Sequence, residues 1–417
     1  MVRPFKNIQY YKFCAYGFFK NLRFFDAFLI LIFREAGLSY LQIGLLYSIR
    51  EISKNLFEIP SGLVADTFGR KKAMLFSFGS YIFSFLVFYF GSAFLVFAAA
   101  MVFFGFGEAF RSGTHKAMIL RFLEEHNWAS LKTQFYGRTR SWSQIGSALS
   151  SLLAAGVIFF THQYRALFLI STIPYIIDFL NLASYPNYLD NAQRQLNQNF
   201  IERLKNNLRD YFKQFRQLHQ VRAFFSAASF GGFFKTLKDY LQPLLQTLAL
   251  QLPLFLALNQ KQRAALLIGL SYFLLYLLTS FSSRQAFKVE ARFKNLPLAI
   301  DVAYLVGVLA VVFSGLFLSF KFTLIAALLY VGLYLIQNIR RPLIVSYLSE
   351  ILPSNIMASG LSTASQLETL LVIITSPLLG ALVDHLGLGP GILIIGLLYL
   401  LFFFLVRLSP NQSKMLN

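Results

Sequence analysis

Ionisable side chains recur inside the long apolar stretches of this chain, where an unpaired charge is costly. Glu108, Arg111 and His115 follow the i, i+3, i+7 spacing of one helix face. An arginine at such a place can bind a carboxylate or phosphate, and a carboxyl group can take up and release a proton. Asp26 and Lys235 also lie near the middle of their apolar stretches. Together these residues predict a site for an anion and for proton exchange at membrane depth.

Each of these residues also has a structural interpretation. Asp26 and Glu108 could be permanently ionised partners of Arg23 and Arg111. His115 could be a packing residue on the cytoplasmic side instead of a proton shuttle. Both interpretations stay open at the level of the sequence.

A second set of charges lies at Arg50, Lys54 and Glu58, with the i, i+4, i+8 spacing of a helix, and Glu51 is adjacent. Opposite charges three or four residues apart on a helix can pair. We therefore interpret this set as a structural ladder of ion pairs and not as a substrate site.

The elements that position these residues are long apolar segments. Of the 417 residues, 56% are hydrophobic and 13% are charged, which lies outside the usual composition of soluble domains. A helix of about 20 apolar residues crosses the roughly 30 Å of hydrocarbon in a bilayer. Such segments recur at 13–35, 41–65, 73–92, 94–120, 137–160, 165–185, 223–250, 263–283, 297–317, 320–346, 358–384 and 389–408. Because the runs are continuous, they predict an all-α membrane protein with twelve transmembrane helices and not a β-barrel.

The net charge of +20 could suggest a nucleic-acid partner, but the positions of the basic residues indicate membrane topology instead. Most lysines and arginines fall in connections on the side of the N-terminus, including the triplet at 70–72 and the segment 194–222. Basic residues are enriched in cytoplasmic connections. We therefore predict that both termini are cytoplasmic, in a bacterial-type inner membrane.

One long hydrophilic stretch divides the predicted helices six and six. It gives an N-terminal bundle at 1–185, a linker at 186–222 and a C-terminal bundle at 223–417. Apolar residues recur in the linker at helical spacing between lysines and arginines, which favours an amphipathic helix on the membrane surface. A solvated connector with little helix is the alternative.

A faint internal repeat supports this division. The segment "HKAMILRFLEE" at 115–125 aligns without a gap on "RRPLIVSYLSE" at 340–350, and each copy ends the fourth predicted helix of its half. Ser143 and Gln144 in the fifth helix correspond to Ser365 and Gln366 in the eleventh. Duplicated halves with a ligand site near the bilayer midplane are typical of transporters.

The segment "GLVADTFGRKKA" at 62–73 follows the second predicted helix, and "EIPSG" at 58–62 leads into it. Its residues Gly62, Asp66, Gly69, Arg70 and Lys71 match the motif between the second and third helices of the major facilitator superfamily, which this chain resembles. The resemblance covers nearly the whole chain and implies two pseudo-symmetric six-helix bundles. The corresponding connection of the second half, "SSRQAFKVEARFKN", lacks the motif.

The resemblance also implies roles for particular residues. The five motif residues would form a conformational latch, because the aspartate in this family faces the start of the eleventh helix as well as the neighbouring arginine. The first, fourth, seventh and tenth helices of the family line a central cavity. We therefore expect proton coupling at Asp26 and Glu108, and substrate contacts at Arg111, Lys235, Gln337, Asn338, Trp142 and Tyr240. Trp142 and Tyr240 could equally be core residues.

The predicted function is secondary active transport of a small polar or anionic organic solute by alternating access, with protons as a coupling ion. A drug and proton antiporter is the main alternative, although the fifth helix lacks the proline of the efflux signature. An intramembrane enzyme or lipid-handling protein is a further alternative. The sequence has no nucleotide-binding loop, and its five histidines and one cysteine show no metal-ligand spacing.

The partners follow from these predictions. We expect a small-molecule substrate, the lipid bilayer and protons, with no nucleic acid, cofactor or metal. The protein is expected to be a monomer and not an enzyme.

Overall fold

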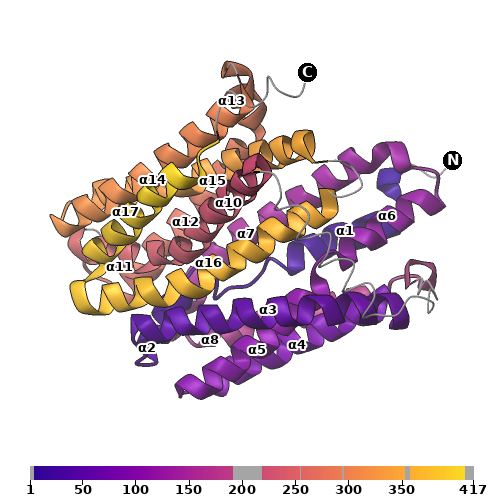
Figure 1. Ribbon diagram of the computed structural model, residues 1–417. Helices are drawn as coiled ribbons and strands as arrows, with labels where there is room; N and C mark the ends of the chain where they lie inside the picture. Colours follow the sequence, from indigo (N-terminus) through magenta and orange to yellow (C-terminus); the bar gives the residue numbers. More distant parts are fainter. Residues whose placement is uncertain (1–3, 191–217, 254, 294, 353–356, 409–417) are drawn as a thin grey trace. The chain divides into compact units, whose positions relative to one another are not determined.

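The computed structural model describes residues 4–190, 218–253, 255–293, 295–352 and 357–408. Every regular element in these ranges is a helix, and no strand occurs among them (Figure 1). The predicted all-α class is confirmed. Most of the predicted linker, including the apolar positions of its proposed amphipathic helix, lies outside the described residues.

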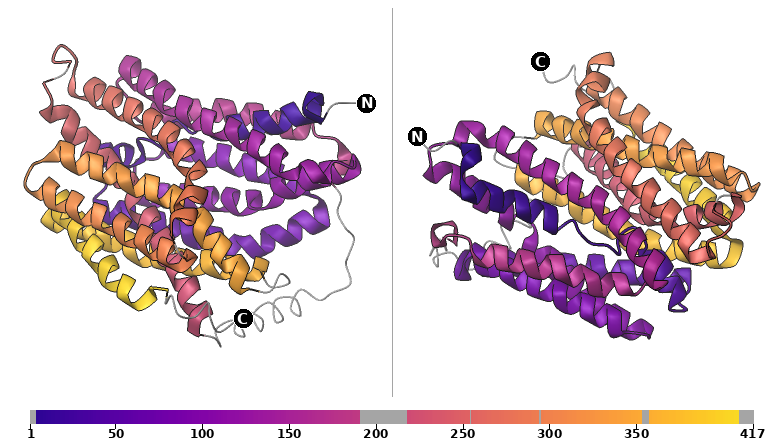
Figure 2. Two further views of the ribbon diagram at one scale, coloured as in Figure 1. Left: turned by 90° about the horizontal axis from the view of Figure 1, so that it is seen from above. Right: turned by 180° about the vertical axis from the view of Figure 1, so that it is seen from behind.

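The described residues group into two compact units. The first unit takes its residues from 1–38, 49–196 and 249–276. Within it, α4 packs against both α5 and α8, and α1 packs against α7. Helices α4 and α5 run side by side in Figure 1, and Figure 2 shows the helices from two further sides. Its helices are α1 (Ile8–Phe19), α2 (Leu29–Glu35), most of α3 (Tyr40–Phe68), α4 (Arg70–Phe90), α5 (Phe94–Arg111), α6 (Thr114–Glu125), α7 (Lys132–Thr161), α8 (Ala166–Ala183) and the first part of α12 (Gln260–Arg284).

The second unit takes its residues from 39–48, 197–248 and 277–417. Helix α14 packs between α15 and α17, and α10 packs against α16. Besides the first turns of α3 and the end of α12, it holds α10 (Leu218–Leu237), most of α11 (Leu241–Gln251), α13 (Ala286–Arg292), α14 (Leu296–Ser319), α15 (Thr323–Ile351), α16 (Met357–Leu386) and α17 (Leu388–Val406). The predicted division into halves at 186–222 stays a prediction.

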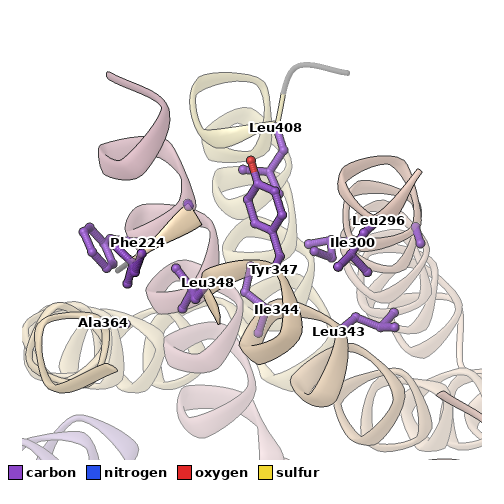
Figure 3. Packing of buried hydrophobic residues seen from close by; sticks show 12 residues of the cluster. Phe224, Leu296, Ile300, Leu343, Ile344, Tyr347, Leu348, Ala364 and Leu408 are labelled. Atoms are coloured by element: carbon purple, nitrogen blue, oxygen red, sulfur yellow. The ribbon is translucent and has the colours of Figure 1, made fainter. Parts of the chain in front are cut away.

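A buried apolar cluster holds the helices of the second unit together at one end. Phe224 of α10, Ile300 of α14 and Leu348 of α15 are each almost fully buried, and Leu408 joins them just beyond α17. Figure 3 shows Tyr347 of α15 among the labelled side chains of this cluster. Burying such large apolar side chains stabilises the helix ends by about 2 kcal/mol for each side chain.

Nine helices in the described ranges are long and apolar enough to cross a membrane. They correspond to the predicted third to sixth and eighth to twelfth spans. The predicted second span is α3, a continuous helix that carries four ionisable residues between Arg50 and Glu58. The predicted first and seventh spans are interrupted, so a count of uninterrupted apolar helices omits them. Twelve crossings remain consistent with these elements.

The first predicted span breaks between Phe19 and Leu29, where the chain places charged residues. Side chains of α8 replace part of the helical hydrogen bonding there. The Tyr175 hydroxyl donates to the Lys20 carbonyl oxygen at 2.9 Å, and the Phe24 N–H donates to Ser171 Oγ at 3.0 Å. Non-helical backbone at membrane depth is tolerated when neighbouring helices satisfy it in this way.

The seventh predicted span is interrupted in a similar manner. Helix α10 ends at Leu237, a 3₁₀ turn, η4 (Lys238–Tyr240), follows, and α11 begins at Leu241. The hydroxyl of Tyr330 donates to the Leu237 carbonyl oxygen at 2.6 Å, and Tyr334 donates to the Lys238 carbonyl oxygen. In each unit, tyrosine hydroxyls from a neighbouring helix therefore stabilise the break.

Helices α3 and α16 touch along their backbones near the start of α3. A side chain at Gly44 would collide with the backbone of Ser376 and Pro377, and one at Gly380 would collide with the backbone of Tyr40. Ser48 Oγ donates to the Ile373 carbonyl oxygen at 2.8 Å in the same contact. Only glycine allows this approach at both positions.

Candidate functional site

The break in the first predicted span places a charged cluster in the first unit. Arg23 Nε lies 3.1 Å from Asp26 Oδ2, and Arg23 Nη1 lies 4.0 Å from Glu108 Oε1 of α5. The guanidinium also stacks over the Phe104 ring at 5.5 Å. The two acids predicted to carry protons therefore share one arginine.

Glu108 also lies close to charges on α3. A side chain at Gly105 would collide with the backbone of Arg50 and Lys54, so glycine there lets α5 approach α3 closely. Arg50 and Lys54 therefore interact electrostatically with Glu108, as Arg23 does. Glu108 is thus surrounded by three basic residues from two segments.

The predicted ladder along α3 is found only in part. Arg50 Nη2 lies 3.1 Å from Glu51 Oε1, and both side chains are largely buried. No ion pair joins Lys54 to Glu58 within the described part of the chain. Instead, Lys54 lies within electrostatic range of Glu108, which spacing along one helix could not indicate.

Arg111 ends α5, and Gly113 follows with a φ of +75° before α6 begins. The Arg111 Nε–H donates to the Tyr81 hydroxyl at 3.2 Å. Among the described residues, its guanidinium lies within 4.0 Å of no carboxylate. This partly buried cation is therefore able to receive an anion.

The residues that the internal repeat aligns, His115 and Arg340, are both buried, the first against α1 and the second against α10. The His115 ring stacks on Tyr16 of α1 with centroids 3.6 Å apart. Arg340 donates from Nη2 to Ser226 of α10, at 2.9 Å to the carbonyl oxygen and 2.8 Å to Oγ. These contacts favour packing over proton transfer for His115.

The second unit has its own charge pair. Lys235 Nζ of α10 lies 2.8 Å from Glu368 Oε1 of α16, and each side chain is 24% exposed. One turn earlier, a side chain at Gly231 would collide with the Glu368 carboxylate. A small residue thus makes room for the acid beside the lysine. A second pair in η4 joins Lys238 Nζ to Asp239 Oδ1 at 3.3 Å.

The uncharged candidates lie in different surroundings. Tyr240 is buried in η4 and stacks on Tyr40 with centroids 5.9 Å apart. Gln337 and Asn338 are half-buried on α15, where Asn338 Nδ2 donates to the Tyr334 carbonyl oxygen at 2.9 Å. Trp142 is an exposed residue of α7 in the first unit. The structure therefore brings Arg23, Asp26 and Glu108 together in the first unit, and Lys235 and Glu368 together in the second.

The predicted latch residues lie at the junction of α3 and α4. Gly62 is in α3, the side chain of Asp66 lies outside the described part, and Gly69 adopts a φ of +103°. The Lys71 N–H donates to Asp190 Oδ1 at 2.7 Å, and Lys71 Nζ donates to the Tyr185 carbonyl oxygen at 2.8 Å. Arg70 Nη1 reaches the Ala117 carbonyl oxygen at 3.5 Å. The chain just after α8 thus holds the start of α4.

Comparison with known proteins decides the family. The model of the Major Facilitator Superfamily matches residues 13–370. The chain belongs to this superfamily. It is therefore an integral membrane transporter and not an enzyme, and the predicted resemblance is confirmed.

Individual relatives agree with this assignment. An uncharacterized MFS-type transporter of Bacillus subtilis (strain 168), YxaM, is 24% identical over 393 residues, which cover 93% of this chain and 92% of YxaM. The crystal structure of the nucleoside transporter NupG matches with a TM-score of 0.77 and 13% identity, over 96% of this chain and 98% of NupG. A D-xylose–proton symporter matches with a TM-score of 0.71 and 16% identity, over 97% of this chain and 98% of that one. At these identities the structural matches show the fold.

The structure of this superfamily member also reveals a second copy of the latch motif that the sequence interpretation missed. The spacing Gly, three residues, Asp, two residues, Gly at 62–69 recurs at 380–387, at the junction of α16 and α17. Gly387 has a φ of +92°, as Gly69 has a φ of +103°. A direct comparison of the two junctions would have identified this repeat.

Asp384 of the second copy caps α3. Its Oδ1 accepts the Tyr40 N–H at 2.9 Å, and its Oδ2 accepts the Leu41 N–H at 2.7 Å. Ser39 and Gln42 form a capping box. The Ser39 N–H donates to Gln42 Oε1 at 2.9 Å, and the Gln42 N–H donates to Ser39 Oγ at 3.2 Å. Together these contacts satisfy four donors at the start of α3, which a helix cannot satisfy by itself.

Glu368 is a further functional candidate, which sequence reasoning did not select. Its partner Lys235 lies in a different helix, far away along the chain. Helical spacing identifies neighbours within one helix only, so no pattern in the sequence points to this pair.

Proposed function

We propose that this transporter is a secondary carrier that moves a small polar organic anion across the bacterial inner membrane by alternating access, coupled to protons. The observation that carries this proposal is Arg111, a partly buried guanidinium that contacts a tyrosine hydroxyl and no carboxylate among the described residues. A cation held in this way favours a carboxylate or phosphate on the solute, because charge-assisted hydrogen bonds are roughly twice as strong as neutral ones.

Lys235 is the second proposed solute contact. Its ammonium group is held by Glu368 at 2.8 Å, so an anionic solute would compete with Glu368 for the lysine. Solute binding would then break the ion pair between Lys235 and Glu368, which joins α10 to α16. Gln337, Asn338, Trp142 and Tyr240 are proposed as further contacts, through amide hydrogen bonds and ring stacking.

Asp26 and Glu108 are the proposed proton carriers. They share Arg23, so protonation of one acid leaves the arginine to the other. A proton that arrives at one of them thus changes which acid Arg23 pairs with. We propose that this exchange accompanies the transport cycle.

The motif copies at 62–69 and 380–387 are proposed as latches that open and close during alternating access. Asp384 caps the start of α3, and Asp66 is proposed as the latch residue of the first copy. Both termini are proposed to be cytoplasmic, because the basic residues gather on that side. A D-xylose–proton symporter with the same fold gives precedent for proton coupling.

The experiment is a flux assay with purified protein in proteoliposomes. A thermal-shift screen of small carboxylates and phosphates first identifies compounds that stabilise the protein. Uptake of each hit is then measured with and without an imposed pH gradient. We expect an anionic compound to accumulate in the liposomes against its own concentration gradient when the pH gradient is imposed. In Arg111→Ala, both the stabilisation by this compound and its uptake should be lost.

The control is Arg292→Ala, which removes an exposed arginine from α13. It should behave like the wild-type protein. Accumulation of cationic or neutral drugs in exchange for protons would support the antiporter alternative. Anion uptake that Arg111→Ala leaves unchanged would refute the assignment of the site.

A further inference from the structure

A cavity of about 550 Å³ opens at the end of the second unit where α10 and α14 begin and α17 ends. Its polar residues are Arg222, Asp301 and Arg407, one from each of three segments. The remaining walls are apolar and include Leu298 and Phe404. None of these residues belongs to the charged clusters of the proposed solute site.

The two arginines give the cavity an excess of positive charge. Within the described ranges, neither the Arg222 nor the Arg407 guanidinium makes a hydrogen bond or an ion pair. Asp301 interacts electrostatically with Arg407 and with the buried Arg340, and its Oδ2 accepts the Leu408 N–H at 2.9 Å. The single carboxylate therefore does not balance the basic groups around it. A phosphodiester group would offset the excess.

The arginines are carried on a rigid frame. Phe224 lies two residues after Arg222, and Leu408 directly follows Arg407; both are buried in the apolar cluster of Figure 3. Ile300 of the same cluster directly precedes Asp301. The backbone beneath all three polar residues is therefore fixed, so a ligand would have to order only the outer parts of the arginine side chains.

The apolar wall continues from the arginines toward the outside of the helices. Leu298 of α14 is 41% exposed, and Phe404 of α17 is 58% exposed. A free anion would leave these side chains unused, whereas an amphipathic molecule would cover them with its hydrocarbon part. Basic pockets between transmembrane helices on the cytoplasmic side are known to bind anionic headgroups.

We infer that this cavity binds the headgroup of an anionic phospholipid of the phosphatidylglycerol class. The phosphate lies between Arg222 and Arg407, and the acyl chains run along Leu298, Leu305 and Phe404. The site would tie the ends of α10 and α17 to the inner leaflet, where the predicted topology places them.

The test is a titration of the full-length protein, in detergent, with phosphatidylglycerol, phosphatidylcholine or phosphatidylethanolamine, followed by thermal unfolding. Wild-type protein should be stabilised by phosphatidylglycerol only, because a ligand that binds the folded state raises its melting temperature. In Arg222→Gln/Arg407→Gln the phosphatidylglycerol concentration needed for half the effect should rise by roughly thirtyfold, about fivefold for each arginine. Inorganic phosphate alone should give no shift in any variant.

The controls separate a lost site from a lost fold. Arg292→Gln removes an exposed arginine that does not line the cavity, and it should titrate like the wild type. Arg222→Lys/Arg407→Lys keeps both charges and should keep most of the shift. If the double glutamine variant does not fold, Arg407→Gln alone should show the fivefold change.

Three results would overturn the inference. The first is equal stabilisation by the zwitterionic lipids, and the second is an unchanged titration in Arg222→Gln/Arg407→Gln. The third is a shift with inorganic phosphate as large as that with phosphatidylglycerol, which would make the cavity a site for a free anion.

Discussion

Removal of the Lys235 and Glu368 charges tests how strongly α10 and α16 are coupled. Two unit charges 2.8 Å apart attract by about 6 kcal/mol at an effective dielectric constant of about 20. Desolvation of both groups offsets much of this attraction, and removal of one partner from a fully buried pair costs about 3–5 kcal/mol. Since each side chain here is 24% exposed, we expect Lys235→Met or Glu368→Gln to cost about 2–3 kcal/mol each.

The double variant Lys235→Met/Glu368→Gln should cost much less than the sum of the two single variants. Each single variant leaves an uncompensated charge at membrane depth, whereas the double variant leaves none. We therefore expect a total cost of about 1–2 kcal/mol. Since the two single variants together cost about 4–6 kcal/mol, the coupling energy should be about 2–5 kcal/mol, which reaches the upper end of the range found for residues in direct contact.

The assay is reversible unfolding in mixed micelles of increasing denaturing detergent, followed by circular dichroism of the helices. Lys321→Met is the control for the change in side-chain type, because Lys321 is an exposed residue between α14 and α15. It should alter stability by less than about 0.5 kcal/mol. Additive costs of the two single variants, with no coupling energy, would refute the reasoning that the pair acts as one unit.

Three further substitutions test the proposed site and latches. Arg111→Ala should weaken solute binding by about tenfold or more, because a hydrogen bond to a charged group is worth about 1.5–3 kcal/mol; isothermal titration against Arg292→Ala checks this, and equal affinities would contradict it. Asp66→Asn should reduce the transport rate without changing the amount of inserted protein, as flux and immunoblot measurements would show; an unchanged rate would contradict a latch. Asp384→Ala should destabilise the start of α3 by about 0.5–2 kcal/mol, and faster amide hydrogen exchange at Tyr40 would report it, whereas unchanged exchange would not fit a cap.

The sequence predicted the helical class, the family and most of the membrane-crossing helices, because a bilayer requires long apolar segments and internal hydrogen bonding. It did not predict the breaks in the first and seventh spans. Hydropathy is averaged over a window of about 20 residues. A short polar interruption such as Lys238–Tyr240 therefore barely changes the mean hydropathy of its segment. Hydroxyl groups of other helices, such as that of Tyr330, make these breaks possible, and such contacts are not local in sequence.

The sequence indicated which residues belong to the candidate site, but not which of them contact one another. The sequence placed Asp26, Glu108 and Arg111 at membrane depth, but spacing could not indicate that the two acids share Arg23. The pairing of Lys235 with Glu368 depends on how α10 packs against α16. Contacts between helices are fixed by packing of whole faces, which a single sequence does not reveal.

Because Gly44 and Gly380 have no side chains, the backbones of α3 and α16 lie in direct contact at these two positions. No side chain is interlocked at these two positions, so a small shift of one helix along the other requires no rotamer change there. Among the hydrogen bonds of the described residues, those of the Asp384 carboxylate and of the Ser48 hydroxyl must break for such a shift. An alanine at either glycine would bring its Cβ against the backbone of the other helix, so even this small substitution would force the two helices apart at the crossing.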